Sequence, residues 1–260
     1  MSESEIRLYT YAMSPYAAKV HCFLLYKKLD FECFYINPFR VKQDLPIGKQ
    51  IPVLTIGEEH RADSTPIGLW LDELFPDARM LLPADPAERD ALLRIDDWVS
   101  QSMIPGSFRS YPGEGMDHIL NGWKLSYVMG KTARGGIPLP LRIAWPLLIT
   151  RVGFVRRMIE QADDGLPVRE SRLKLYDEFV AHLAGGPFLA GRTTPSLPDF
   201  SAYPQFALYY QVGFRGAGDI EGSPEIMGWL GRMKPYLSGM PPMLPARVCK
   251  RDVPPLSHDD

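Results

Sequence analysis

The opening of the chain alternates between short strand-like runs and a helical run. Residues 6–11 and 31–36 are rich in β-branched and aromatic side chains, which predicts two strands. Between them, apolar positions recur at helical spacing over residues 15–28, and Ser14 precedes a proline at the first helical position, as a helix N-cap does. The pattern predicts a β-α-β unit.

The stretch that follows predicts two more strands and a second full helix. Residues 37–48 carry prolines and mixed charges, typical of an irregular or short helical connection. Residues 50–54 predict a strand, which a tight turn joins to another near residues 60–62, and residues 63–75 have helical spacing. Over residues 1–82 the predicted order is therefore β-α-β-α-β-β-α, the thioredoxin-like arrangement.

Beyond a proline-rich boundary near residues 82–86, helical patterns replace the strand signals. We expect a thioredoxin-like α/β domain over residues 1–82, an all-α domain over residues 87–245 and a loose tail over residues 246–260. Residues 107–115 predict a loop. The clearest helices of the second domain are predicted at residues 87–103, 171–183, 196–210 and 225–233.

Composition narrows the class of protein. Of 260 residues, 45% are hydrophobic and 23% charged, and the formal net charge is −2, which is typical of a soluble globular protein and gives no reason to expect nucleic acid as a partner. Cys22, Cys33 and Cys249 form no C-x-x-C pair and no metal-ligand spacing. The acidic start lacks the features of a signal peptide. We expect no metal and a cytoplasmic location.

Gln50-Ile51-Pro52 opens the third predicted strand. A proline at strand entry is structurally ordinary, because it donates no ladder hydrogen bond. The functional interpretation is a cis Ile51–Pro52 bond that leaves the backbone N–H and C=O of Ile51 open to an extended peptide, which would pair as an added strand.

Several fragments, taken in order, resemble the glutathione S-transferase family. They are Ser14-Pro15-Tyr16 with Lys19-Val20, Gln50 to Leu54, Asp63-Ser64, Ala190-Gly191 and Ser196-x-x-Asp199. The resemblance covers nearly the whole chain except roughly residues 105–165. It implies a glutathione S-transferase-like architecture, glutathione as co-substrate and a homodimer.

The resemblance places Ser14 where serine-type or cysteine-type members carry their active residue. Glutathione must react as its thiolate, although a free thiol has a pKa of about 8.5. A hydroxyl donor at a helix N-terminus stabilises that anion, and lowering the pKa by two units requires about 2.7 kcal/mol. Serine disfavours a mixed disulfide with glutathione. The alternative is that Ser14 only caps its helix.

Tyr11 and Tyr16 are rival hydroxyl donors. Tyr11 falls near the position at which tyrosine-type members of the family carry their active residue, and Tyr16 follows Ser14 closely. The alternative for each is ordinary strand or surface packing.

The remaining glutathione contacts are implied by the resemblance. Asp63 and Ser64 correspond to an acidic-serine pair that holds the γ-glutamyl end, although the family usually has Glu at the first position. Gln50 corresponds to a residue that contacts the glycyl carboxylate. A positive charge there would come from Arg40, Lys42 or Lys49, each of which is alternatively a solvated surface residue.

The pair Ser196 and Asp199 is a capping-box variant with Asp in place of Glu, so we assign it to folding and not to catalysis. Its loss would cost about 0.5–2 kcal/mol.

The midsection, residues 118–159, contains seven basic residues and no Asp or Glu. It is strongly apolar over residues 137–155, but its prolines and arginines argue against a membrane-spanning helix. The simplest interpretation is packed helices with a solvated basic face. The alternatives are membrane-surface attachment and binding of an anionic, apolar substrate.

The midsection also resembles the branch of the family that includes prostaglandin E synthase type 2. The resembling residues are Asn37 to Arg40, Asp96-Asp97-Trp98, the midsection and Val168 to Glu170. That branch carries Cys where Ser14 stands, so its chemistry does not transfer.

Two functional hypotheses follow. In the first, the protein is a glutathione transferase that activates the thiol of glutathione for attack on an apolar electrophile. In the second, a non-catalytic member has kept the fold and uses its basic midsection to bind a lipid, a membrane surface or a protein.

Overall fold

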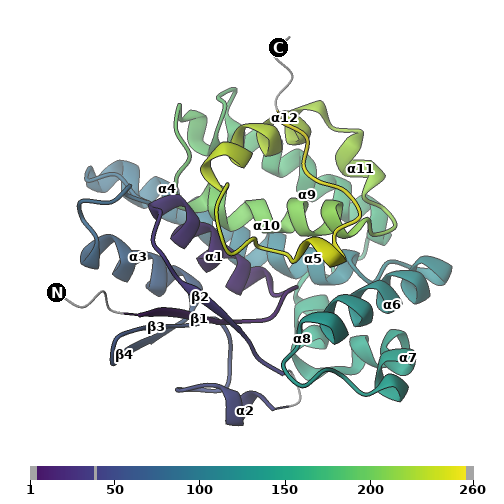
Figure 1. The fold of residues 1–260 in the computed structure, drawn as a ribbon. Helices are drawn as coiled ribbons and strands as arrows, with labels where there is room; N and C mark the ends of the chain where they lie inside the picture. The colour runs from purple at the N-terminus through teal and green to yellow at the C-terminus, as the bar shows by residue number, and fades with distance from the viewer. Residues whose placement is uncertain (1–4, 38–39, 256–260) are drawn as a thin grey trace.

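A four-stranded mixed sheet forms the N-terminal part of the molecule (Figure 1). The computed structural model describes residues 5–37 and 40–255. Strands β1 (Ile6–Thr10), β2 (Glu32–Tyr35), β3 (Val53–Ile56) and β4 (Glu59–Ala62) lie in the order β2-β1-β3-β4. β1 is parallel to β2 and antiparallel to β3, and β3 pairs antiparallel with β4.

Helices cover both faces of this sheet. α1 (Pro15–Lys27) and α3 (Ser64–Leu74) lie on one face, and the short α2 (Val41–Asp44) lies beyond the other (Figure 1). Side chains alternate between the two faces of the sheet along β1, and each face is covered by its own apolar cluster. Leu8 enters the main core, while Tyr9 packs on the opposite face with Val53. The predicted order β-α-β-α-β-β-α and the thioredoxin-like fold class are confirmed.

The rest of the described chain is helical, as predicted. Its longest helices are α4 (Pro86–Trp98), α5 (Ile104–Ser110), α6 (Gly115–Thr132), α7 (Leu139–Leu148), α8 (Gly153–Gln161), α9 (Val168–Leu183), α10 (Leu197–Val212) and α12 (Pro224–Met233). The shorter pieces are the π-helical turn η1 (Val99–Met103), α11 (Gly218–Glu221) and the 3-10 turns η2 (Ile149–Arg151), η3 (Leu189–Gly191), η4 (Lys234–Tyr236) and η5 (Ala246–Val248).

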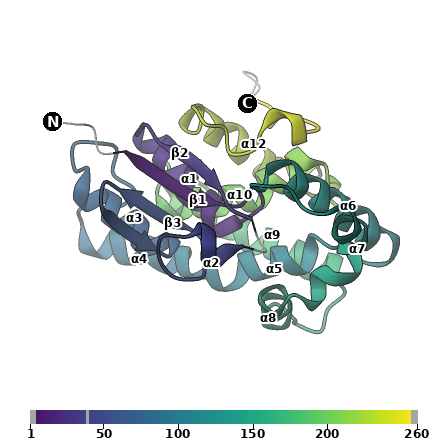
Figure 2. The ribbon, with the colours of Figure 1, turned by 60° about the horizontal axis from the view of Figure 1, so that its bottom comes forward.

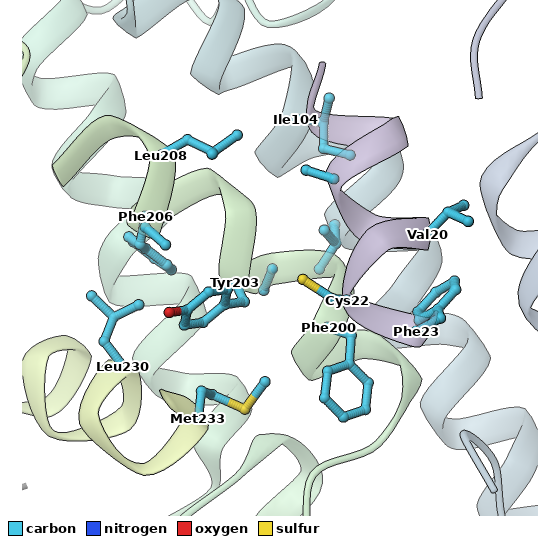
Figure 3. Close-up of a cluster of buried hydrophobic side chains, with 14 of the residues drawn as sticks. Val20, Cys22, Phe23, Ile104, Phe200, Tyr203, Phe206, Leu208, Leu230 and Met233 are labelled. Atoms are coloured by element: carbon cyan, nitrogen blue, oxygen red, sulfur yellow. The ribbon is translucent and has the colours of Figure 1, made fainter. Parts of the chain in front are cut away.

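Helix α10 joins the two parts. Every residue of α10 except Gln211 is buried, and α10 packs along α1. Phe200 projects from α10 toward α1, and Tyr203 and Phe206 project toward Trp229 of α12 (Figure 3). The Phe23 and Phe200 rings meet edge to face, with centroids 6.4 Å apart. One continuous apolar core therefore runs from the sheet through α1 into the helical region.

The ends of these helices follow the predicted signals. Ser14 is the N-cap of α1 with Pro15 in the first turn. Ser196 and Asp199 form the predicted capping box of α10, in which the Asp199 carboxylate accepts from Ser196 N at 2.9 Å.

The predicted loop at residues 107–115 is wrong over its first part. The chain passes from α4 through the π-helical turn η1 into α5, which continues to Ser110. Gly106 is a packing residue and not a helix breaker, because a Cβ there would lie 2.2 Å from Leu175 Cδ1. The Ser107 hydroxyl donates to Met103 O at 3.0 Å, so this polar residue is satisfied within the helix.

The predicted loose tail, residues 246–260, is also wrong for its described part. Val248 and Val253 are 5% and 1% exposed. Lys250 N donates to Gln211 O at 2.8 Å, and Arg251 Nε donates to Tyr210 O at 2.8 Å. The buried valines and the hydrogen bonds to the last carbonyls of α10 hold this segment in place, although it has little regular secondary structure.

Helices α6 and α7 form a closely packed hairpin in the midsection (Figures 1 and 2). Gly122 permits this approach, since a Cβ there would lie 2.8 Å from Pro146 Cα. Within the described ranges, none of the helices is both long and apolar enough to cross a bilayer.

Candidate functional site

The register of the sheet brings three sequence-predicted segments to one end. Tyr9 of β1 pairs with Val53 of β3, which pairs with Ala62 of β4. Since β3 runs antiparallel to both neighbours, the chain leaving β1, the chain entering β3 and the chain leaving β4 meet beyond this row. Ser14, Ile51 and Ser64 lie in these three segments.

Ser14 is buried at the start of α1, with 9% of its surface exposed. Its Oγ accepts a hydrogen bond from Ala17 N at 3.3 Å, as an N-cap does. This bond occupies a lone pair of the oxygen and leaves the hydroxyl proton available for donation. The serine can therefore cap the helix and donate to an anion at the same time.

The start of α3 combines a buried hydroxyl with an exposed carboxylate. Ser64 is 1% exposed, and Asp63 precedes it with a positive φ of 73° and no side-chain capping bond. The Asp63 carboxylate is therefore not used as a cap, although the residue stands at the N-cap position. Together they offer a negative charge for an ammonium group and a hydroxyl beside helix N-terminal amides for a carboxylate.

The Tyr16 hydroxyl points toward the helical region. It donates to Ser100 O at 3.3 Å. Burial raises the pKa of Tyr16 to about 12, and the charge of Asp63 adds to the effect. The phenol is therefore neutral at physiological pH, and its proton is already engaged.

Tyr11 lies beside a small hollow between the sheet and α6. Burial raises its pKa to about 12, with a contribution from Asp44, so this hydroxyl is also a neutral donor. The hollow is mostly apolar and is lined by Tyr11, Ala12, Tyr35, Ile36, Met129, Thr132 and Ala133.

At the entry to β3, the Ile51–Pro52 peptide bond is cis, as predicted. Pro52 is buried and Ile51 is partly buried against the second apolar cluster. The Ile51 N–H and C=O have no backbone partner within residues 5–37 and 40–255. Gln50 is exposed beside them, as are Lys49 and Arg40.

Sequence reasoning missed a buried charged network behind these segments. Lys19 of α1 and Asp96 of α4 are 0% and 2% exposed, and Lys19 Nζ lies 2.7 Å from Asp96 Oδ1. Thr65 Oγ1 accepts from Lys19 Nζ and donates to Asp96 Oδ2, both at 2.7 Å. The Ser201 hydroxyl of α10 donates to Asp96 Oδ1 at 2.5 Å.

This network fixes the starts of α1 and α3 against the helical region. Burial lowers the pKa of Lys19, and the Asp96 carboxylate opposes that shift. Thr65 adjoins Ser64, and Lys19 lies little more than one turn after Ser14. A usable signal was present in the sequence, since Lys19 and Asp96 have opposite charges and each falls at helical spacing from a buried apolar residue, Phe23 and Leu92.

The cysteines do not form a reactive or metal-binding group in the described structure. Cys22, Cys33 and Cys249 are unpaired. Burial raises the pKa of Cys22, and it raises that of Cys33 to about 12. Over residues 5–37 and 40–255, no three metal-ligating side chains come together.

A protein-family model matches the part of the chain that contains the three segments of this site. Residues 8–79 match the family model described as "Glutathione S-transferase, N-terminal domain". The curated glutathione S-transferase U27 of Arabidopsis thaliana is 27% identical over 124 residues, 45% of this chain. The matched region spans about half, 55%, of that relative.

Solved structures with the same architecture cover nearly all of both chains. The β-etherase LigF of Sphingobium sp. strain SYK-6 has a TM-score of 0.61 at 20% identity, with coverage of 89% of this chain and 96% of its own. A rice glutathione S-transferase solved in complex with glutathione has a TM-score of 0.58 at 18% identity, with coverage of 94% and 93%. The fold is that of the glutathione S-transferases, and the sequence matches support that family.

Proposed function

We propose that this protein is a glutathione-dependent transferase of the serine type, in which Ser14 activates the thiol of glutathione for attack on an apolar electrophile. The observation that carries the proposal is the meeting of three segments at one end of the sheet: the Ser14 turn, the backbone of Ile51 and the start of α3.

Ser14 would act through its free hydroxyl proton. The Ala17 amide holds the oxygen in place, and the hydroxyl donates to the sulfur once the thiol has released its proton to solvent water. The N-terminus of α1 adds a favourable partial charge. The thiolate then attacks the electrophilic carbon, a C–S bond forms, and the leaving group departs with the electron pair of the broken bond.

Glutathione would lie extended across the three segments. Its cysteinyl backbone pairs with the N–H and C=O of Ile51 beside Pro52. Asp63 holds the ammonium group, and Ser64 with the first amides of α3 holds the carboxylate of the γ-glutamyl end. Gln50 contacts the glycyl carboxylate, with Lys49 or Arg40 supplying the positive charge.

The second substrate would enter from the side of α6. The hollow beside Tyr11 is apolar and adjoins the loop that carries Ser14. Its lining favours an electrophile with an apolar body. Tyr11 is the alternative thiol donor, because its neutral hydroxyl borders the same hollow.

We further propose a homodimer, as the family resemblance implies, and a cytoplasmic location, with which the three unpaired cysteines are compatible. The resemblance of the midsection to the prostaglandin E synthase type 2 branch remains a hypothesis. It gives no chemical role to Ser14.

Calorimetric titration with glutathione tests the binding part of the proposal. The native protein should bind saturably, and Ser64→Ala should weaken binding at least about tenfold, because a hydrogen bond to a charged group contributes about 1.5–3 kcal/mol. Ser171→Ala is the matched control, since Ser171 is a buried serine in the first turn of α9. Absence of binding by the native protein at millimolar glutathione would reject the proposal.

A further inference from the structure

Helix α7 exposes a row of large apolar side chains. Leu139, Ile143 and Leu147 follow one another at four-residue spacing, and each is 61–63% exposed. This spacing places them on one face of the helix. On α6, Trp123 and Tyr127 have the same spacing and are 48% and 42% exposed.

The two rows lie on the same side of the α6–α7 hairpin. The helices run antiparallel, because His118 contacts Pro146 at one end of the hairpin and Ser126 contacts Arg142 farther along. Trp123 Nε1 donates to Ile143 O at 3.0 Å, which joins the rows directly. We call these five exposed side chains, Trp123, Tyr127, Leu139, Ile143 and Leu147, the apolar face.

A basic residue ends each row. Lys131 follows Tyr127 by four residues, and its Nζ lies 5.7 Å from the centre of the Tyr127 ring. Arg151 follows Leu147 by four residues, in the turn η2, and is exposed. Because the helices are antiparallel, these two charges flank opposite ends of the apolar face.

The surroundings of the apolar face carry little opposing charge. From residue 118 to residue 159 the sequence contains no Asp or Glu. The acids that border this stretch are paired with arginines: Asp117 lies 3.7 Å from Arg215, and Glu160 pairs with Arg156 of the stretch itself at 2.9 Å. The charge of the partner that fits this surface is therefore negative.

We propose that the apolar face binds the surface of a membrane that contains anionic lipids. Apolar side chains enter the boundary between headgroups and acyl chains, Trp and Tyr favour the same depth, and the flanking basic residues attract the lipid phosphates. The hairpin lies at one edge of the molecule (Figures 1 and 2), and the chain leaving α6 contacts the sheet, where Arg134 N donates to Tyr35 O at 3.3 Å. None of the five side chains of the apolar face lines the hollow beside Tyr11, so the two proposed sites use different residues.

A second copy of this chain fits the apolar face less well. A two-fold contact would place the same surface on both partners. It would bring Lys131 and Arg151 of each copy to the edges of one interface without an acidic partner from the acid-free stretch. Anionic lipid supplies the complementary charge that a second copy lacks.

Co-sedimentation with lipid vesicles tests this proposal. The native protein should sediment with vesicles of phosphatidylcholine and phosphatidylserine far more than with phosphatidylcholine alone, and binding should fall as salt screens the charges. The variant Leu139→Gln/Ile143→Gln/Leu147→Gln should bind at least about tenfold more weakly, because its apolar row is lost. Lys131→Glu/Arg151→Glu should abolish the preference for anionic vesicles.

The matched control is Met80→Gln/Leu166→Gln, because these side chains are also exposed, at 42% and 37%, and lie outside the apolar face. It should sediment like the native protein. Trp123 provides a second readout, since its fluorescence should shift to the blue with anionic vesicles and the shift should disappear in Trp123→Phe.

Three results would overturn the proposal. They are no sedimentation of the native protein, equal sedimentation of the native protein and the triple Gln variant, or a native dimer that the triple Gln variant converts to a monomer in size-exclusion chromatography. Glutathione binding by each variant shows separately whether the fold and the proposed thiol site are intact.

Discussion

His21 illustrates how a single buried side chain links distant parts of the chain. It lies on α1 and is 3% exposed. Its Nε2 donates to Pro241 O at 2.7 Å, and its Nδ1 lies 3.5 Å from Cys33 Sγ, in a position to accept the thiol proton. Burial lowers the pKa of His21 to about 4, and the bond to Pro241 only partly opposes this shift.

This shift predicts a loss of stability in mild acid. The unfolded chain binds a proton at His21 near pH 6.5, whereas the folded chain binds it only near pH 4. Between these values the unfolded state holds more protons, so the free energy of unfolding falls as pH falls, by up to about 3 kcal/mol from this group.

Urea unfolding of the native protein and His21→Gln between pH 7 and pH 4.5 measures this effect. Gln keeps a donor for Pro241 but has no proton to bind in this range. The native protein should lose more stability than the variant as pH falls, and parallel curves for the two proteins would contradict the assignment.

At the scale of helices, the pair Lys19 and Asp96 locks four elements together. Lys19 belongs to α1, Asp96 to α4, Thr65 to α3 and Ser201 to α10. Removing charges from water is costly, so the pair adds little net stability compared with apolar residues, but breaking it leaves a buried, uncompensated charge. The network therefore favours one docking geometry between the sheet layer and the helical region.

We expect Asp96→Asn to lower the free energy of unfolding by about 3–5 kcal/mol, because it leaves Lys19 buried without its counter-charge. Guanidinium unfolding measures the loss. Lys19→Met/Asp96→Leu should recover most of it, since neither charge remains.

The exposed pair Arg156 and Glu160, with side chains 68% and 60% exposed, supplies the control. Arg156→Ala should change stability by less than about 1 kcal/mol. Equal losses in the free energy of unfolding for Asp96→Asn and Arg156→Ala would show that burial of the network does not raise the cost of breaking it.

Local signals in the sequence predicted most elements because each signal acts over a few residues. Ser14 and Ser196 mark helix starts that their own side chains stabilise, so both predictions were confirmed. The loop predicted at residues 107–115 was wrong over its first part, because α5 packs against another helix, as the close approach of Gly106 to Leu175 shows, and the local pattern does not contain that contact.

At the scale of the whole molecule, the connection between the two parts is held by a second buried pair. Lys27 Nζ lies 2.9 Å from Asp72 Oδ1, and the Asp72 carboxylate also accepts from Leu81 N and Leu82 N. This carboxylate fixes the segment that leads from α3 toward α4. Nothing in the local pattern indicated it, because the partners come from separate elements.

The tail shows the same limit. Its prolines predicted a loose segment, yet burial of Val253 and the bonds to the end of α10 depend on where the chain returns in space. Asn37 is similar, since its amide donates to Arg134 O at 3.0 Å and Gly136 O at 3.1 Å across the molecule. Such contacts form only when the sheet layer and the helical region pack together, so the local sequence pattern does not indicate them.

The segments of the candidate site were easier to predict from the sequence than the contacts that hold them in place. Once the strand order is thioredoxin-like, the end of β1, the start of β3 and the end of β4 lie at one edge of the sheet, so the segments that carry Ser14, Ile51 and Ser64 begin there. The direction of the Tyr16 hydroxyl toward Ser100 was not predictable, because it depends on how the helical region docks.

The central claim is that Ser14 activates the thiol of bound glutathione, and ultraviolet titration of its thiolate tests that claim most directly. In the native complex the thiol pKa should lie about one to two units below the free value near 8.5. In Ser14→Ala the thiol pKa of bound glutathione should rise again by at least about one unit. Ser223→Ala is the control: it removes the N-cap of α12, far from the site, and should leave the thiol pKa unchanged. An unaltered thiol pKa in Ser14→Ala would contradict the account.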